Sequence, residues 1–280
     1  MAGKWWNESW NPVTGCTACS EGCAHCYAKA MHERLFQSTK FEKIVLHPER
    51  LDKPSRMKAG KVIFVDSMSD LFHEDVPFGF IQDVFRAMRN NYQHTYVILT
   101  KRLNRVPDFL NFVSRDFYVH FIAERENIWF GTTVENQDRA EERIPLLLDT
   151  PIGHKLISVE PMLGPVELKP EWLVPKWDSQ YGVNSATIQS VICGGESGTG
   201  GRPMQPDWAR GVRDKCAAAG VPFYFKQWGE WAPDELDGFL VRSRGKGRML
   251  DGVEWNELPW KKAIETTIVN PPATEQLELI

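Results

Sequence analysis

The chain repeats one local pattern, in which a short apolar or β-branched run is followed by polar residues and then by a stretch typical of a helix. Nearly continuous hydrophobicity marks strands that are buried on both faces, as in a parallel sheet. The runs begin at Lys61, His94, Asn127, His154, Ser190 and Pro222, and the helices are expected at 78–90, 103–113, 137–148 and 206–219. Since βα alternation gives parallel strands joined by right-handed crossovers, the sequence predicts an α/β fold, either a complete or a partial (β/α) barrel with parallel strands.

We expect one barrel domain over residues 1–260. Prolines and polar residues interrupt the alternation near 164–187, which is expected to be an irregular insertion. Residues 261–280 include two adjacent prolines and show no clear periodicity, so they are expected to form a peripheral C-terminal tail.

Composition excludes several classes of protein. Of the 280 residues, 42% are hydrophobic and 25% are charged, which supplies enough apolar material for a core and excludes a disordered or fibrous chain. No apolar run approaches the roughly 18 residues that a membrane helix needs, and the first residues lack the apolar stretch of a secretory signal. The formal net charge of −4 does not indicate a nucleic-acid binder. We therefore expect a soluble, cytoplasmic protein with no membrane partner.

Polar residues end the predicted strands, at positions that share one rim in a βα barrel, where active sites lie. Glu135 and Glu160 directly follow apolar strand cores, where a carboxylate is costly unless it is paired or bound to a ligand. Lys101, Arg102 and Arg202 are candidates to bind a carboxylate or a phosphate. We take Glu135, Glu160, Lys101 and Arg202 as candidate catalytic residues. The alternative for each is a residue that begins a loop or a solvated surface charge.

Four of the six cysteines, Cys16, Cys19, Cys23 and Cys26, are separated by only two, three and two residues. This spacing lets one short loop surround a single metal centre with thiolates. Zinc ribbons place about 15 to 20 residues between their two cysteine pairs, whereas only three residues intervene here, so the spacing favours an iron–sulfur cluster over zinc. The two remaining cysteines are expected to be small buried hydrophobic residues.

The cysteine pattern, followed by the aromatic Tyr27, resembles the three-cysteine signature of radical S-adenosylmethionine enzymes, whose fold is a partial or complete βα barrel. The segments WNPVTGC, GCAHCYA, DSMSDLFHEDVP, ILTKR, GTTVENQ, SVEPMLGP and FKQWGEW resemble, more narrowly, a phage-associated family of such enzymes, catalogued as phage proteins of unknown function. This resemblance runs from about Trp10 to Trp260. The barrel is also distantly similar to that of the spore photoproduct lyase group.

The resemblance implies that three thiolates hold a [4Fe–4S] cluster, whose fourth iron is open to the amino and carboxylate groups of S-adenosylmethionine. In the phage-associated family the usual ligands correspond to Cys16, Cys23 and Cys26, with an apolar residue in place of Cys19. Cys23 and Cys26 are therefore implied as ligands, and the third ligand is either Cys16 or Cys19. An aromatic residue in the position of Tyr27 packs near the adenine in the superfamily; the alternative is an ordinary core residue.

The resemblance also implies a set of cofactor contacts. Many enzymes of the superfamily carry a Gly-Gly-Glu motif after the second strand, but here the motif at 194–196 follows a late strand. Its glycines either let the backbone approach a ligand or form a tight turn. Asp66, Ser67, Ser69 and Asp70 are the alternative contacts to the methionyl amine. The expected cofactor-binding residues are Tyr27, Asp66, Ser67, Thr100, Thr132, Gly194, Gly195 and Glu196.

The implied activity is reductive cleavage of S-adenosylmethionine, with an electron from a flavodoxin- or ferredoxin-type donor, to a 5′-deoxyadenosyl radical that abstracts hydrogen from its substrate. Relatives in phages modify DNA, including isomerisation of a glycine-linked thymine, which implies a nucleobase in DNA or a nucleotide as substrate. Stacking surfaces for an extruded base are offered by tryptophans such as Trp5, Trp6, Trp10, Trp228 and Trp231. The alternative is a non-catalytic module in which zinc or an iron–sulfur cluster braces the N-terminus.

Overall fold

The structure of the chain, a computed structural model, describes residues 4–35, 39–118, 122, 126–178, 183–234, 240–242 and 247–260. The tail expected at 261–280 lies outside the described residues. None of the described helices combines the length and the apolar character that crossing a bilayer requires.

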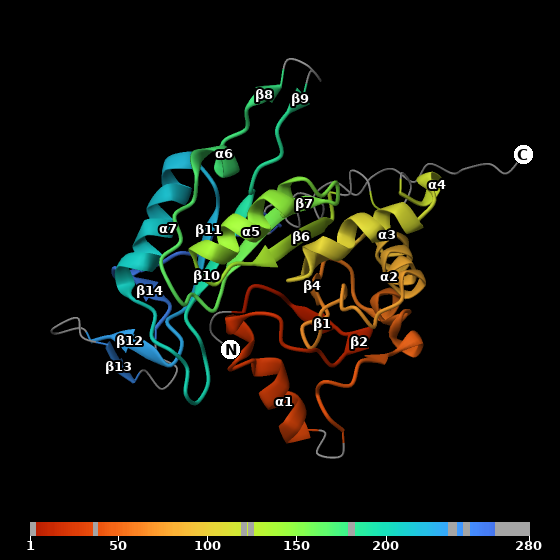
Figure 1. The fold of residues 1–280 in the computed structure, drawn as a ribbon, viewed down its shortest axis with the longest axis horizontal. Helices are drawn as coiled ribbons and strands as arrows, with labels where there is room; N and C mark the ends of the chain where they lie inside the picture. Colours follow the sequence, from red (N-terminus) through yellow and green to blue (C-terminus); the bar gives the residue numbers. More distant parts are fainter. Residues whose placement is uncertain are drawn as a thin grey trace, which may run out of the picture.

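Seven parallel strands form one curled sheet, which is half of a barrel (Figure 1). In spatial order they are β1 (Glu8–Trp10), β4 (Val62–Val65), β5 (Thr95–Leu99), β6 (Ile128–Thr133), β7 (His154–Val159), β10 (Ser190–Gly194) and β11 (Phe223–Gln227). Every neighbouring pair runs parallel. The expected α/β barrel is therefore partial rather than complete. Six strands coincide with the predicted runs, whereas β1 was not predicted.

Four helices connect the strands and form an arc around the sheet (Figure 1). They are α2 (Phe78–Asn90), α3 (Val106–Phe112), α5 (Gln137–Leu148) and α7 (Pro206–Ala219), as predicted except that the second begins as the 3-10 helix η4 (Leu103–Arg105). The last of them ends at Gly220, whose φ of 68° is a left-handed conformation that glycine adopts at little cost.

Further helices and strand pairs extend these layers. The helices are η1 (Glu21–Cys23), α1 (Tyr27–Leu35), η2 (Pro48–Arg50), η3 (Lys53–Arg56), α4 (Arg115–Phe117) and α6 (Pro170–Leu173). The antiparallel strand pairs are β2 (Val13–Thr14) with β3 (Val45–Leu46), β8 (Trp177–Asp178) with β9 (Val183–Asn184), β12 (Trp231–Pro233) with β13 (Leu240–Arg242), and β14 (Met249–Leu250) with β15 (Val253–Glu254). The region near 164–187 is thus less irregular than expected, because it contains α6 and the β8–β9 pair.

Alternate residues of each strand point to opposite faces of the sheet and pack into two hydrophobic clusters. In β4, for example, Val65 packs on the side of the helices and Phe64 packs on the concave side. The concave cluster also receives Trp5 and Trp260 from the two ends of the described chain, with ring centroids 5.9 Å apart. Since each fully buried large side chain contributes about 1.5–3 kcal/mol, these terminal segments help to hold the half-barrel together.

Candidate functional site

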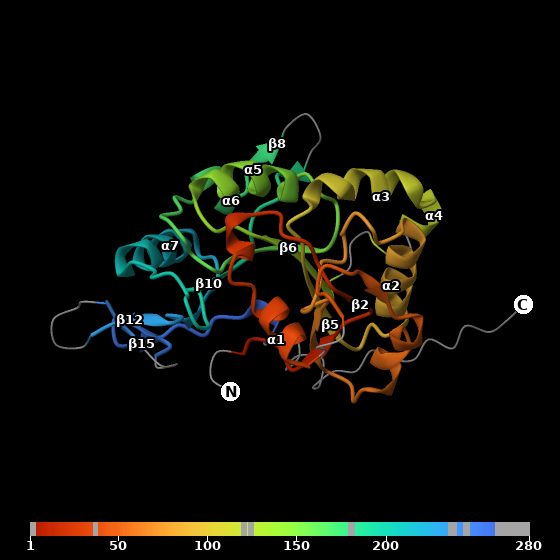
Figure 2. The ribbon, with the colours of Figure 1, turned by 60° about the horizontal axis from the view of Figure 1, so that its bottom comes forward.

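A cavity of about 450 Å³, here called the rim cavity, lies where the parallel strands end. Residues at or directly after the ends of β4, β5, β7, β10 and β11 line one side of it, and the cysteine loop (residues 15–26) with the start of α1 lines the other. Figure 2 shows α1 beside the sheet and apart from the arc of helices. This is the rim at which the polar strand ends were expected to meet.

The cysteine loop is tied to the rest of the chain where it begins. Gly15 pairs with Ser69 and has a φ of 90°, and a Cβ at this position would lie 2.1 Å from the backbone oxygen of Lys43. The backbone N–H of Cys16 donates to the oxygen of Phe41 at 3.0 Å. Only glycine fits this close approach, which fixes the direction in which the loop enters the rim.

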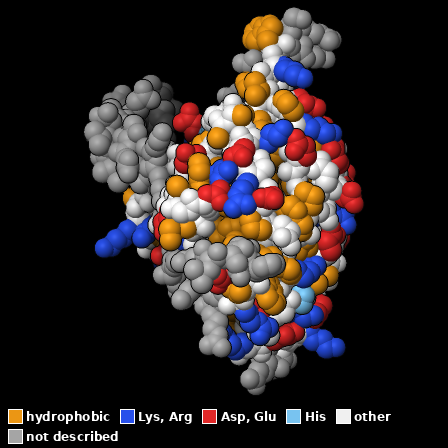
Figure 3. Space-filling view, turned by 90° about the vertical axis from the view of Figure 1, so that its left-hand side faces the viewer, with side chains coloured by type: hydrophobic (Ala, Val, Ile, Leu, Met, Phe, Trp, Pro, Cys, Tyr) orange, Lys and Arg blue, Asp and Glu red, His pale blue; other side chains and the backbone are white. Residues whose placement is uncertain are grey.

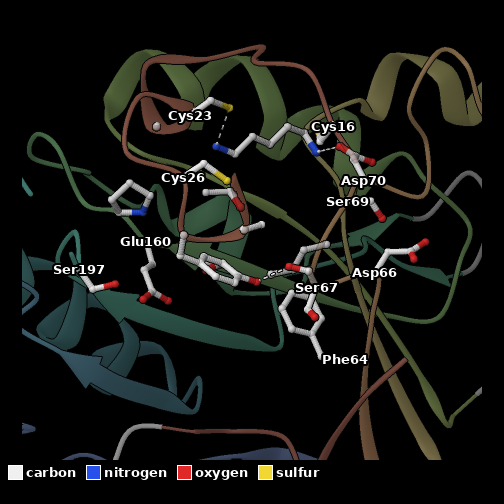
Figure 4. A pocket seen from close by; sticks show the side chains of 18 of the residues that line it. Cys16, Cys23, Cys26, Phe64, Asp66, Ser67, Ser69, Asp70, Glu160 and Ser197 are labelled. Carbon is white, nitrogen blue, oxygen red and sulfur yellow. Dashed lines mark hydrogen bonds between the residues drawn. The ribbon is translucent and has the colours of Figure 1, made fainter. Parts of the chain in front are cut away.

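All four cysteines of the loop are free thiols and line the rim cavity. Cys16, Cys23 and Cys26 are half-buried, whereas Cys19 is exposed. Figure 4 shows the side chains of Cys16, Cys23 and Cys26 on one side of the cavity and Phe64 on the opposite side. In the described part of the chain, no three His, Cys, Asp or Glu side chains converge in the arrangement of a metal site. The donor set itself, several thiols from one short loop around one cavity, suits an iron–sulfur cluster.

Lys101, which follows β5, places its ammonium beside Cys23. Its Nζ lies 3.7 Å from the Sγ of Cys23 and 2.6 Å from Oε1 of Glu135. A hydrogen bond from the Cys19 thiol and the positive charge of Lys101 lower the pKa of Cys23 to about 3, although burial opposes this. Burial alone would lower the pKa of Lys101, but the negative charges of Glu135 and Cys23 raise it. The ammonium and the thiolate therefore stabilise each other.

Arg102 is the corresponding cation at the other end of the loop. Its Nη1 lies 3.7 Å from the Sγ of Cys16 and 3.2 Å from Oδ2 of Asp70, and its Nε donates to Glu74 at 2.9 Å. Burial and the negative charge of Asp70 raise the pKa of Cys16 to about 12, although Arg102 opposes the rise. Cys16 and Cys23 thus have different surroundings, although a cation contacts each of them.

Glu135 and Arg202 were predicted as catalytic residues, but neither lines the rim cavity. Glu135 is completely buried and accepts hydrogen bonds from Lys101, Ser20 and Arg143. Arg202 is paired with Glu196 and donates from Nη2 to the backbone oxygen of Glu21 at 3.0 Å. The structure therefore places both behind the cysteine loop, where they hold it, and not where they would touch a ligand in the cavity.

Some of the expected cofactor-binding residues line the rim cavity and others do not. Tyr27, Asp66, Ser67, Thr100, Gly195 and Glu196 line the rim cavity. Thr132 and Gly194 do not line it, because the hydroxyl of Thr132 donates to the backbone oxygen of Thr100 at 2.7 Å and Gly194 lies within β10. The hydroxyl of Tyr27 donates to the backbone oxygen of Ser67 at 2.5 Å. Tyr27 is nevertheless half exposed, so it is not an ordinary core residue.

Asp66 carries an unsatisfied oxygen next to the cavity. Its Oδ1 accepts the backbone N–H of Val13 at 2.9 Å, whereas its buried Oδ2 has no hydrogen-bond partner. The residue has a φ of 53°, a left-handed conformation that is uncommon outside glycine, asparagine and aspartate. Burial raises its pKa well above the ordinary value. A buried polar atom without a partner at the wall of a cavity is suited to a ligand that supplies the missing hydrogen bond.

Another part of the cavity combines a second ion pair with aromatic rings. The Nζ of Lys226 lies 2.7 Å from Oε1 of Glu160, and the side-chain amide of Gln227 donates to the same oxygen at 3.3 Å. The Nζ of Lys226 also lies 5.7 Å from the ring centroid of Trp6, and Trp5 lines the cavity as well. The other three tryptophans named as stacking surfaces do not line the cavity: Trp10 and Trp228 are buried in the core on the helix side, and Trp231 lies outside the cavity lining.

Sequence reasoning named Arg102 as a candidate to bind an anion and Asp70 as an alternative contact to the methionyl amine, but it did not select Lys226 as a functional residue. All three line the rim cavity and pair with other residues of the site. The available signal for Lys226 was its place at the end of a predicted strand, which is the same signal that selected Glu160 and Lys101.

A protein-family model described as "Protein of unknown function (DUF5131)" matches residues 2–259. No curated protein and no solved structure matches the chain. Because the family model extends over almost the entire chain, including the cysteine loop and every strand of the sheet, the protein belongs to the DUF5131 family.

Proposed function

We propose that this protein is a radical S-adenosylmethionine enzyme whose cysteine loop holds a [4Fe–4S] cluster. One observation carries the proposal: cysteines with the spacing of that superfamily line a single cavity at the carboxyl ends of a curled parallel sheet. The cations that contact Cys16 and Cys23 add support, because they offset the negative charge of thiolate ligands.

We assign the three cluster ligands to Cys16, Cys23 and Cys26. These three sulfurs are half-buried, and a guanidinium group contacts Cys16, whereas Cys19 is exposed. The hydrogen bond between the thiols of Cys19 and Cys23 raises the pKa of Cys19, so the Cys19 thiol is the donor of that pair. Cys19 then supports Cys23 from outside the ligand set.

Residues around the cavity would bind and orient the cofactor. When bound, the cluster supplies one electron for cleavage of S-adenosylmethionine to methionine and a 5′-deoxyadenosyl radical, which abstracts hydrogen from the substrate. The unpartnered oxygen of Asp66 would accept a hydrogen bond from the methionyl ammonium, which brings its own positive charge. The half-exposed ring of Tyr27 provides a surface for the adenine. Trp5 and Phe64 add apolar walls that keep water away from the reacting atoms.

We further propose that the substrate is a nucleobase in DNA, with an adduct of thymine as the leading candidate. Lys226 and Gln227 donate hydrogen bonds and Glu160 accepts them, so this part of the cavity can pair with a ring edge that carries both acceptors and a donor. The rings of Trp5 and Trp6 provide stacking surfaces for a base taken out of the helix. On the face in Figure 3, acidic and basic side chains are interspersed with hydrophobic ones, so the described residues of this face form no basic stripe for a DNA backbone and the proposal rests on the cavity.

The cluster proposal is tested by anaerobic reconstitution with iron and sulfide, followed by dithionite and S-adenosylmethionine. We expect a coloured protein that produces 5′-deoxyadenosine and methionine, as detected by chromatography with mass spectrometry. The variant C23A should produce neither product and is the matched control. A colourless protein that binds zinc and yields no 5′-deoxyadenosine would support the alternative, a non-catalytic metal-binding module, and would overturn the proposal. A flavodoxin or ferredoxin in place of dithionite tests the proposed electron donor.

The substrate proposal needs a separate experiment. DNA that contains modified thymines is treated with the reconstituted enzyme and then digested to nucleosides for mass spectrometry. We expect a nucleoside with a changed retention time or mass, and we expect the variants E160Q and K226M to reduce its yield more than the yield of 5′-deoxyadenosine. An unchanged digest across a panel of thymine adducts, with 5′-deoxyadenosine still produced, would reject the substrate and leave the radical chemistry standing.

A further inference from the structure

Glu135 is the centre of a buried network behind the cysteine loop. Its side chain is 0% exposed, and a buried carboxylate is stable only when cations and hydrogen-bond donors surround it. Arg143 donates to Oε2 at 2.9 Å, and Oε1 accepts from Lys101 at 2.6 Å and from the hydroxyl of Ser20 at 2.5 Å. Two cations and one hydroxyl group therefore meet one carboxylate.

The three donors come from different parts of the fold. Arg143 lies in α5, the helix that follows Glu135, so this pair fixes the carboxylate locally. Lys101 comes from the end of β5, and Ser20 comes from the cysteine loop. The network therefore joins the loop to two neighbouring strand ends.

Gly22 provides a second, independent observation that the cysteine loop contacts the side chain of Glu135. A Cβ at Gly22 would lie 2.5 Å from Oε1 of Glu135 and 2.6 Å from its Cγ. The backbone of the loop therefore packs directly against the carboxylate, at a distance that no other residue allows without movement.

The network also determines where the ammonium of Lys101 lies. Its Nζ is 3.1 Å from the hydroxyl oxygen of Ser20 and 3.7 Å from the Sγ of Cys23. The backbone N–H of Cys23 donates to the oxygen of Ser20 at 3.0 Å, which closes the turn η1. The contacts that hold Ser20 and Lys101 thus also fix the surroundings of the Cys23 sulfur.

We infer that Glu135 is a positioning residue, which pins the Ser20–Cys23 turn and holds the ammonium of Lys101 against the sulfur of Cys23 before any cluster is present. Glu135 itself touches neither cofactor nor substrate. This inference rests on the proposed function only in taking Cys23 as a cluster ligand. It assigns to Glu135 and Lys101, which sequence reasoning grouped as catalytic residues, the preparation of the ligand loop.

The first test uses the full chain without metal. Hydrogen exchange with mass spectrometry is measured for peptides that cover residues 18–26, and a peptide from α7 serves as the internal reference. S20A removes the contact of the loop with Glu135 but leaves both buried ion pairs in place, and E135Q removes the charge at their centre. We expect each variant to raise exchange in residues 18–26 by about fivefold or more, because one hydrogen bond that closes the loop is lost or weakened.

The matched control is E142Q, which makes the same chemical change at an exposed carboxylate of α5. Its exchange in residues 18–26 should equal that of the wild-type protein. If E135Q does not fold, as judged by circular dichroism, S20A alone decides the test. Exchange in S20A equal to that in E142Q would overturn the inference.

The second test separates positioning from a merely structural role. After reconstitution, the midpoint potential of the cluster is measured in K101M and K101R. Loss of the cation in K101M should lower the midpoint potential, because a nearby positive charge favours the reduced cluster. K101R keeps a positive charge, so its potential should lie close to that of the wild-type protein. Equal potentials in the wild-type protein and K101M would overturn the part assigned to Lys101. A wild-type chain that assembles no cluster would instead reject the proposed function, and the exchange result would still stand.

Discussion

The Nη2 of Arg102 and the backbone oxygen of Thr17 lie 3.0 Å apart, which ties the end of β5 to the cysteine loop 85 residues earlier in the chain. The same guanidinium contacts Cys16, Asp70 and Glu74 and is only 4% exposed. Arg102 therefore holds one end of the loop, and the Glu135 network holds the middle. The loop is braced from behind, while its sulfurs face the rim cavity.

We predict that R102M destabilises the protein by roughly 3 kcal/mol, because Asp70 then loses its buried cation. The control R115M changes an exposed arginine of α4 and should lie within about 0.5 kcal/mol of the wild-type protein. Urea unfolding followed by circular dichroism gives both values. Equal stabilities of R102M and R115M would contradict the bracing role.

We predict that G22A destabilises the protein by about 1–3 kcal/mol, because its methyl group would overlap the pinned carboxylate of Glu135. G211A is the matched control, because Gly211 lies within α7 and an added Cβ there meets no atom within 4 Å. This control should be more stable than wild type by roughly 0.5–1 kcal/mol, since alanine favours a helix. Thermal unfolding distinguishes the two, and a G22A protein as stable as wild type would show that the loop is not packed against Glu135.

We predict that the single variants C16A, C23A and C26A lose the visible absorbance of the reconstituted cluster and most of its iron, because each removes one ligand of three. C19A should keep both, since its exposed sulfur lies outside the proposed ligand set. Iron and sulfide analysis of the four proteins checks this. Loss of the cluster in C19A together with its retention in C16A would move the third ligand to Cys19.

We predict that Asp66 makes the free energy of unfolding depend on pH. Burial raises the pKa of Asp66 in the folded protein, whereas the unfolded chain releases this proton near the ordinary value of 3.8. Above that pH the folded state binds more protons than the unfolded state, so stability falls as the pH rises towards the folded pKa. D66N lacks this proton and keeps an acceptor for the N–H of Val13, and asparagine tolerates the φ of 53°.

The advantage of D66N over the wild-type protein should therefore grow as the pH rises from about 4. Urea unfolding of both proteins over a series of pH values measures this difference. A difference that stays constant with pH would show that Asp66 is ionised in the folded protein as readily as in the unfolded chain.

The sheet could be predicted because its strands are buried on both faces and therefore appear as short apolar runs between helices. β4 and β10 are examples in which every residue is buried. β1 escaped prediction because its three residues, ESW, contain a single buried side chain and obtain their strand conformation from pairing with β4. Such pairing depends on the tertiary structure, which local sequence patterns do not contain.

The sequence predicts which residues lie at the ends of the strands, but it does not predict which of these side chains contact one another. Glu135 and Glu160 were both selected because each follows a strand. Glu135 is buried behind the cysteine loop, whereas Glu160 lines the cavity. The difference arises from Gly22, whose missing side chain lets the loop cover Glu135. Such a long-range fit depends on the path of the loop, which the spacing of the cysteines does not determine.

We propose that Cys16, Cys23 and Cys26 hold one iron–sulfur cluster with an iron open to S-adenosylmethionine. The most direct measurement is the electron paramagnetic resonance spectrum of the reconstituted, dithionite-reduced protein before and after S-adenosylmethionine is added. We predict a cluster signal whose g-values shift when S-adenosylmethionine binds, in the wild-type protein and in C19A. A protein without a cluster signal, or with one that S-adenosylmethionine leaves unchanged, would contradict it.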